Sequence, residues 1–190
     1  MAYIQVENHL PGVTGLLEFR KDAAEPLREL TQLLLRGANT LTEAERELIA
    51  TAVSHKNECV YCTTSHAAAA DAYYGDHEIT EKVKNNIETA PISNKMKALL
   101  MIALQVQESG KKVTQQSIEN AKKQGATDLE IHDTVMIAAL FCFYNRYVDG
   151  LGTFAPTDPN YYTEMAQRLK EKGYYRPQRG YDEVKDKKYE

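Results

Sequence analysis

Two cysteines, two histidines and a glutamate lie close together in the segment from Glu47 to His66. The cysteines form a Cys-x-x-Cys pair, Cys59 and Cys62, and His66 follows four residues after the second one. On a helix that turns about 100° per residue, Cys59, Cys62 and His66 share one face. An imidazole one turn away can take the proton of a thiol, and the thiolate is the reactive form of cysteine. The spacing therefore predicts thiol chemistry at Cys62.

Glu47 joins this group if the segment folds as a helical hairpin that turns near Asn57. Glu47 lies ten residues before that turn and His66 nine residues after it. At about 1.5 Å per residue the two side chains reach nearly the same height. A carboxylate beside an imidazole orients it and raises its proton affinity, so we expect a Glu47–His66–Cys62 relay. The positive end of the second helix is expected to lower the pKa of the cysteines.

Cys59 lies one turn from Cys62 and is suited to resolve an oxidised sulfur. A thiolate that attacks a peroxide becomes a sulfenic acid, which condenses with a neighbouring thiol to a disulfide that an outside donor must reduce. The alternative interpretations are half of a zinc site or two small buried side chains. Four ligands along one helix would span about 16 Å, too far for one zinc ion with bonds of about 2 Å. A metal would therefore need ligands from elsewhere in the chain.

The hairpin is part of a chain whose apolar residues recur at helical spacing, and no segment has the pattern of a strand. Thr42 with Glu45, and Thr127 with Glu130, have the spacing of capping boxes at helix starts. The sequence therefore predicts an all-α protein. We expect its helices at about residues 23–36, 43–55, 59–74, 78–88, 96–108, 114–124, 127–147 and 161–170.

The 190 residues are expected to form a single domain. Residues 1–19, with Pro11 and Gly12, are expected to form an irregular arm, and residues 158–190 a last helix and a tyrosine-rich tail that is a candidate interface. The formal net charge of −4 disfavours nucleic acid and anionic membranes as partners. The sequence has no apolar stretch of about 18 residues, the length of a membrane span, and we expect a cytoplasmic protein. Its three cysteines are an odd number, so we expect no disulfide framework.

The arrangement Glu47, eleven residues, Cys59-Val-Tyr-Cys62, three residues, His66 resembles the signature of the alkylhydroperoxidase AhpD and carboxymuconolactone decarboxylase superfamily, in particular its peroxidase-related branch. The flanking segments 41–50 and 143–152 also resemble that branch, and the resemblance covers most of residues 10–157. It implies an AhpD-like helical fold, with a helical hairpin that carries the Cys-x-x-Cys motif, and assembly into homotrimers or homohexamers. It also implies a thiol peroxidase with no cofactor or metal, supported by a dithiol reductant protein or a small thiol.

By the same resemblance Cys62 is the thiol that attacks the hydroperoxide, Cys59 resolves it, and His66 and Glu47 relay protons. Tyr61 stands where AhpD proper has a histidine, and a phenol with a free pKa of about 10 relays protons less readily at neutral pH. The decarboxylase members lack the cysteine pair, so lactone decarboxylation is not expected.

Two functions from other classes compete with a peroxidase. The first is a redox adaptor or sensor, in which Cys59 and Cys62 exchange electrons without fast peroxide turnover. The second is a non-catalytic oligomeric module. Other roles also stay open: core packing is expected for Cys142, His55 is either a helix-terminal cation or a site residue, and Asn145, Arg146 and Asp149 either line the pocket or form interface ion pairs.

Overall fold

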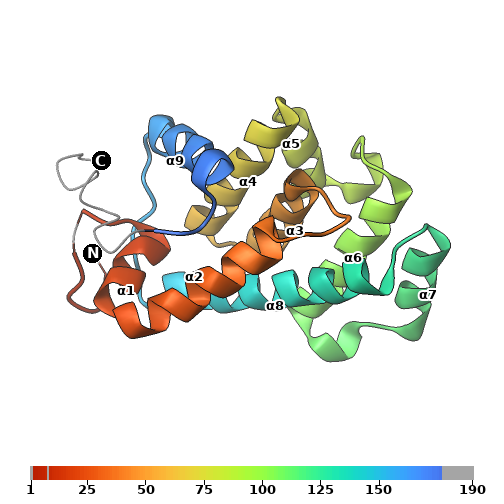
Figure 1. The fold of residues 1–190 in the computed structure, drawn as a ribbon, viewed down its shortest axis with the longest axis horizontal. Coiled ribbons are helices and arrows are strands. Elements are labelled where there is room, and N and C mark those ends of the chain that lie inside the picture. Colours follow the sequence, from red (N-terminus) through yellow and green to blue (C-terminus); the bar gives the residue numbers. More distant parts are fainter. Residues whose placement is uncertain (1, 8, 177–190) are drawn as a thin grey trace.

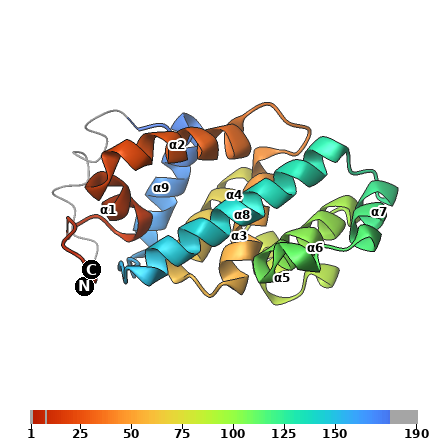
Figure 2. The same ribbon diagram turned by 90° about the horizontal axis from the view of Figure 1, so that it is seen from below.

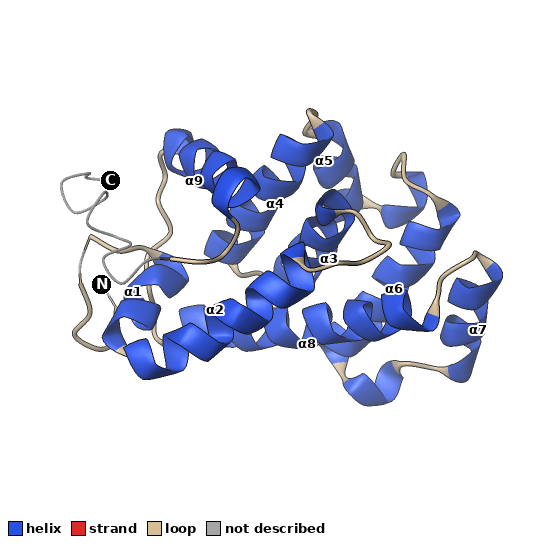
Figure 3. Cartoon of the chain, viewed as in Figure 1, coloured by secondary structure: helices blue, strands red, loops and turns tan. Residues whose placement is uncertain are grey.

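The protein is built from α-helices, as the computed structural model shows for residues 2–7 and 9–176, a part of the chain that contains no strand (Figure 3). The all-α prediction is confirmed. The helices are α1 (Gly12–Phe19), α2 (Lys21–Arg36), α3 (Glu43–Lys56), α4 (Val60–Tyr74), α5 (Glu78–Asn85), α6 (Asn94–Glu108), α7 (Gln115–Lys123), α8 (Asp128–Gly150) and α9 (Pro159–Lys172). Short 3-10 turns cover Ile87–Thr89 and Gly110–Lys112.

The helix α8, 23 residues long, runs along the molecule and packs against α3 and α6 (Figures 1 and 2). The helices α1, α2 and α9 gather at one end of the molecule, and α6 and α7 lie at the other. One continuous apolar core joins α3, α6 and α8, while a smaller apolar cluster surrounds the cysteine pair. Within the described residues, no helix is long and apolar enough to cross a membrane.

The predicted hairpin consists of α3 and α4. A capping box fixes the start of α3: the Thr42 hydroxyl accepts from the backbone N–H of Glu45 at 3.2 Å, and the Thr42 N–H donates to the Glu45 carboxylate at 2.8 Å. The turn needs an unusual backbone conformation at Glu58, whose φ is +61°. Because this turn is tight, Cys59 becomes the N-cap residue of α4 and Cys62 lies in its first turn.

The expectation of an irregular arm over residues 1–19 is wrong in part, because Gly12–Phe19 forms the helix α1. Proline and glycine suggested a break, but Pro11 is the N-cap residue, where its missing N–H removes no hydrogen bond from the helix. Leu16 is fully buried and anchors this helix on the body of the protein. Gly12 has a φ of +53°, and a Cβ atom there would lie 2.2 Å from the ring of Tyr61.

The predicted last helix is α9, which packs against α4. The chain then continues through Gly173, Tyr174 and Arg176, and the remainder of the expected tail, residues 177–190, lies outside the described residues. Whether the segment 158–190 contacts a neighbouring subunit stays a prediction.

Candidate active site

Glu47 on α3 and His66 on α4 face each other across the hairpin, as counting along the sequence predicted. The Nδ1 atom of His66 lies 2.7 Å from Oε2 of Glu47. The Glu47 side chain is fully buried, whereas that of His66 is 12% exposed. An ionised carboxylate only accepts hydrogen bonds, so Nδ1 of His66 is the donor. This contact leaves Nε2 as the atom of a neutral His66 that can accept a proton.

Two residues that sequence reasoning did not find complete the surroundings of Glu47. Arg36, the last residue of α2, places Nη2 at 2.6 Å from Oε1 of Glu47. The hydroxyl of Tyr174 donates to the same oxygen at 2.6 Å and lies 3.4 Å from Nδ1 of His66. The only signal for either in the sequence was the abundance of tyrosine in the tail. Glu47 is thus held by residues from α2, α4 and the segment after α9.

This environment keeps Glu47 ionised. Burial alone would raise the pKa of the carboxyl, but the charge and hydrogen bond of His66, with the contacts of Arg36 and Tyr174, outweigh burial and lower the pKa to about 2. The pKa of Tyr174 is raised well above its ordinary value by burial and by the neighbouring Glu47 carboxylate. At neutral pH the group therefore contains a carboxylate, a guanidinium and a neutral phenol.

The cysteines Cys59 and Cys62 are both free and buried, with 0% and 4% of their surfaces exposed. The neighbouring Cys59 thiol, and then burial, raise the pKa of Cys62, while a hydrogen bond from the side chain of Asn145 opposes them. The expectation that the helix N-terminus would lower the pKa of Cys62 is therefore wrong for the reduced pair. Two adjoining thiols cannot both ionise readily, so the first proton lost belongs to the pair as a unit.

Asn145 is a second residue whose role the structure clarifies. It is buried, and its Nδ2 atom lies 3.0 Å from the Ser54 hydroxyl while its Oδ1 atom accepts from Asn57 at 2.8 Å. This network ties the motif cysteines to α8 and to the turn of the hairpin. Arg146, Asp149 and His55 are instead exposed.

Cys142 is half-buried at the edge of the core, and its sulfur accepts a hydrogen bond from Asn57 at 3.6 Å. It is not among the residues that line the pocket beside Cys62. Its position agrees with the packing role expected for it.

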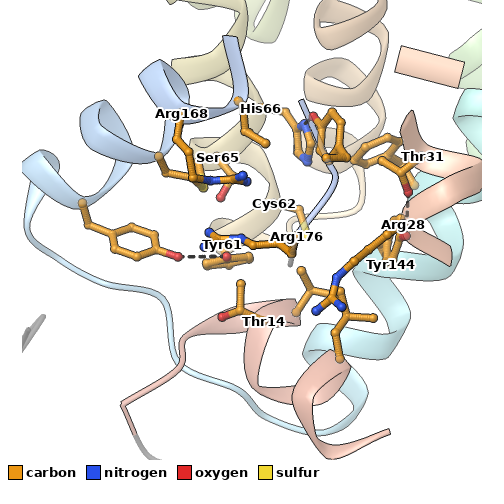
Figure 4. Close-up of a pocket in the computed structure, with 17 residues that line it drawn as sticks. Thr14, Arg28, Thr31, Tyr61, Cys62, Ser65, His66, Tyr144, Arg168 and Arg176 are labelled. Carbon is orange, nitrogen blue, oxygen red and sulfur yellow. Dashed lines mark hydrogen bonds between the residues drawn. The ribbon is translucent and has the colours of Figure 1, made fainter. Parts of the chain in front are cut away.

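A pocket of about 100 Å³ opens beside the motif between α1, α4 and α9 (Figure 4). Cys62 and His66 both line it, whereas Cys59 and Glu47 lie behind its wall. Among the described hydrogen bonds, none joins His66 directly to Cys62. Tyr61 also lines the pocket, with its hydroxyl 3.1 Å from that of Tyr161.

Comparisons with known proteins agree with the all-helical fold. The model of the carboxymuconolactone decarboxylase family matches residues 21–73, which run from α2 through the hairpin. The chain is similar to a peroxidase-related protein with an alkylhydroperoxidase AhpD core from Ralstonia eutropha JMP134: 27% identity, 83% of this chain and 81% of that chain covered, TM-score 0.74. No curated protein sequence matches the chain.

Two further solved structures share the fold. A peroxidase-related protein from Silicibacter sp. TM1040 is 24% identical, with 80% of this chain and 78% of that chain covered and a TM-score of 0.73. A putative antioxidant defence protein AhpD from Agrobacterium tumefaciens is 16% identical, with 75% and 97% covered and a TM-score of 0.66. With its all-helical fold and its cysteine pair on the α3–α4 hairpin, the chain is similar to peroxidase-related proteins with an alkylhydroperoxidase AhpD core, and its segment 21–73 matches the carboxymuconolactone decarboxylase family.

Proposed function

We propose that the protein is a thiol-dependent peroxidase that reduces hydroperoxides through a dithiol and disulfide cycle of Cys62 and Cys59. The observation that carries this proposal is the position of Cys62. It lines a pocket together with His66, whose ring is oriented by the buried carboxylate of Glu47. Cys59 lies behind the pocket wall in contact with Cys62, as a resolving thiol requires.

Because the pKa of Cys62 is raised in the resting pair, its thiol must first lose a proton, and the Cys62 thiolate then attacks the terminal oxygen of the hydroperoxide. An S–O bond forms, the O–O bond breaks, and the substrate leaves as an alcohol after it gains a proton. The proton of Cys62 passes to Nε2 of His66, and a water molecule in the pocket would bridge the two groups. Glu47 stabilises the protonated imidazole, because its carboxylate already accepts the hydrogen bond of Nδ1. The sulfur is oxidised to a sulfenic acid.

In the second step the sulfur of Cys59 attacks the Cys62 sulfenic acid. An S–S bond forms, the S–O bond breaks, and the hydroxyl leaves as water with the proton of Cys59. A dithiol protein or a small thiol then reduces the disulfide and is itself oxidised. We place this cycle in the cytoplasm, where such thiols are kept reduced.

The pocket favours a peroxidase over the two alternatives. A redox adaptor needs no substrate pocket, whereas Cys62 lines a pocket together with a histidine that a buried carboxylate orients. A non-catalytic module has no use for the buried Arg36–Glu47 pair beside the pocket, since removing two charges from water is costly. Both features suit a site that a small hydroperoxide enters.

Stopped-flow measurement of the reaction with cumene hydroperoxide tests the proposal. The wild type is expected to react much faster than free cysteine, and Cys62→Ser to abolish the reaction. Cys59→Ser should still complete one turnover and accumulate the sulfenic acid, because only the resolving thiol is missing. Cys142→Ser is the matched control and should react like the wild type, since Cys142 lies outside the pocket. A wild-type rate no greater than that of free cysteine would refute the peroxidase.

Glu47→Gln tests the relay itself. A positioned general base typically contributes about 10²–10⁴-fold to a rate, and because Glu47 orients the base His66, we expect sulfenic acid formation to slow by up to this factor. A rate within a factor of about two of the wild type would remove Glu47 from the mechanism.

We also propose that the chain forms homotrimers or homohexamers, as its resemblance to the family implies. The helix α8 supports this with an exposed apolar stripe, the side chains Leu129, Met136 and Phe143. Residues seven apart lie on one face of a helix, so the three share one side of α8. Large apolar side chains gathered on one exposed face are typical of protein interfaces.

A further inference from the structure

The pocket beside Cys62 is lined by three arginines that the proposed peroxide chemistry does not use. Arg28 comes from α2, Arg168 from α9 and Arg176 from the segment that follows α9. Among the described residues that line the pocket there is no aspartate or glutamate. A guanidinium is charged at every physiological pH, so all three side chains bring charged N–H donors to this wall, with Arg28 ion-paired to Glu18 at 3.1 Å.

The protein holds two of these arginines in defined positions. Nη2 of Arg28 donates to Glu18 at 3.1 Å, and Nη1 of Arg168 donates to the backbone oxygen of Gly173 at 3.3 Å. A guanidinium carries five N–H donors and its planar fork matches a carboxylate, so it can bind a ligand in addition to a protein group. Arg168 and Arg176 extend toward the part of the pocket near Ser65 and Tyr61, while Arg28 approaches from the side of Tyr144 and Thr31 (Figure 4).

Ser65 supplies an independent sign of a ligand. It is 3% exposed, and its hydroxyl has no hydrogen-bond partner among the described residues. A buried hydroxyl without a partner is unfavourable, and its presence in a pocket marks a position where a ligand or a water molecule binds. Ser65 follows Cys62 by about one turn of α4, and in the close-up it lies next to the Arg168 side chain (Figure 4).

The rest of the pocket wall is apolar and comes from α1, α8 and α9. The side chains are Val13, Leu17, Phe141, Met165 and Leu169. Such walls favour a hydrocarbon body, because they remove it from water. One ligand therefore meets an apolar surface, a hydroxyl beside the reactive sulfur and a group of cations.

We propose that this pocket selects organic hydroperoxides that carry a carboxylate. The hydrocarbon body packs on the apolar wall, the peroxide lies at Cys62 with Ser65 donating a hydrogen bond to it, and the carboxylate binds the arginines. The bond changes at sulfur are those of the proposed function, on which this inference rests, and the carboxylate takes no part in them. The arginines are binding residues that set the substrate preference.

A matched pair of substrates tests the preference: cumene hydroperoxide and its para-carboxylate derivative, which differ only in the carboxylate. We expect kcat/KM for the acid to exceed that for the neutral compound by at least about tenfold, because charge-assisted hydrogen bonds are the stronger ones. In Arg28→Gln and Arg176→Gln this ratio should fall toward one. Arg20→Gln is the control, since Arg20 is exposed and does not line the pocket, and its ratio should match the wild type.

If the wild type has equal kcat/KM values for the two hydroperoxides, the inference is wrong but the peroxidase proposal stands. The same holds if both arginine variants keep the preference for the carboxylate-bearing substrate. Calorimetric titration with the corresponding alcohols, which cannot be reduced, makes the inference testable even if neither hydroperoxide reacts. We expect the carboxylate-bearing alcohol to bind at least about tenfold more tightly than 2-phenylpropan-2-ol, and this difference to vanish in Arg176→Gln. Equal binding of the two alcohols, or no binding of either, would refute the anion site.

Discussion

Replacing Glu47 by glutamine removes the carboxylate that Arg36, His66 and Tyr174 share. The Arg36 side chain is 4% exposed, so the variant keeps a guanidinium buried beside a neutral amide. Removing one partner of a buried ion pair typically costs about 3–5 kcal/mol. Because domains are commonly stable by about 5–15 kcal/mol, we expect Glu47→Gln to fold but to unfold at a much lower urea concentration.

The stabilisation of the folded protein by the Glu47 carboxylate is expected to decrease as the pH falls. The Glu47 pKa is lowered from 4.5 to about 2, so the folded protein binds this proton more weakly than the unfolded chain does. The stabilisation is complete above pH 4.5 and is lost as the pH falls toward 2. The difference between the two pKa values corresponds to about 3 kcal/mol. Glutamine does not titrate. The difference in the free energy of unfolding between wild type and variant should therefore decrease by about 3 kcal/mol between about pH 5 and pH 2.

Urea unfolding followed by circular dichroism at several pH values measures this difference in the free energy of unfolding. A difference that stays constant from neutral to acid pH would refute the reasoning about Glu47, as would a variant as stable as the wild type. Glu130→Gln is a matched control for activity. Glu130 is also buried and ion-paired, to Lys95 at 2.7 Å, but it lies outside the pocket. It should lose stability and keep the wild-type rate with cumene hydroperoxide.

Three further substitutions test other parts of the structure. Gly12→Ala should lower the melting temperature, because the new methyl group meets the ring of Tyr61 at 2.2 Å and the backbone has a φ of +53°. Tyr174→Phe removes a hydrogen bond to the Glu47 carboxylate, which should cost about 1.5–3 kcal/mol in urea unfolding and slow sulfenic acid formation in stopped flow. Phe143→Glu places a charge on the exposed stripe of α8 and should reduce the molecular mass measured by light scattering.

Each of these variants has a control on the same chain. An added Cβ at Gly110 meets nothing within 4 Å, so Gly110→Ala should keep the wild-type melting temperature. Tyr175 is 58% exposed, and Tyr175→Phe should keep the wild-type stability and rate. Phe19→Glu changes an exposed apolar residue on α1 and should keep the wild-type mass. Equal behaviour of a variant and its control would contradict the corresponding assignment.

The sequence allowed the hairpin to be predicted because its signals are local. The capping box at Thr42 sets the start of α3, and the distances of Glu47 and His66 from the turn are fixed by helical rise. Arg36 and Tyr174 could not be found in this way, because their contacts with Glu47 join segments that are far apart along the chain. Only tertiary packing brings them together.

The prediction for the Cys62 pKa was wrong for a related reason. A helix N-terminus is visible in the sequence, whereas the burial of a thiol and its contact with a second thiol depend on the folded structure. The helix α1 was missed because Pro11 and Gly12 are common in loops. In this protein they instead begin a helix, and Gly12 leaves room for the ring of Tyr61.

The position of Tyr174 at the Glu47 carboxylate has a consequence for synthesis of the protein. Cys59, Cys62 and His66 leave the ribosome long before Tyr174, whose hydroxyl reaches the site only after α9 has packed on α4. A nascent or truncated chain therefore contains Cys59, Cys62 and His66 before Glu47 has all its partners. In the proposed mechanism, the C-terminal segment completes the site.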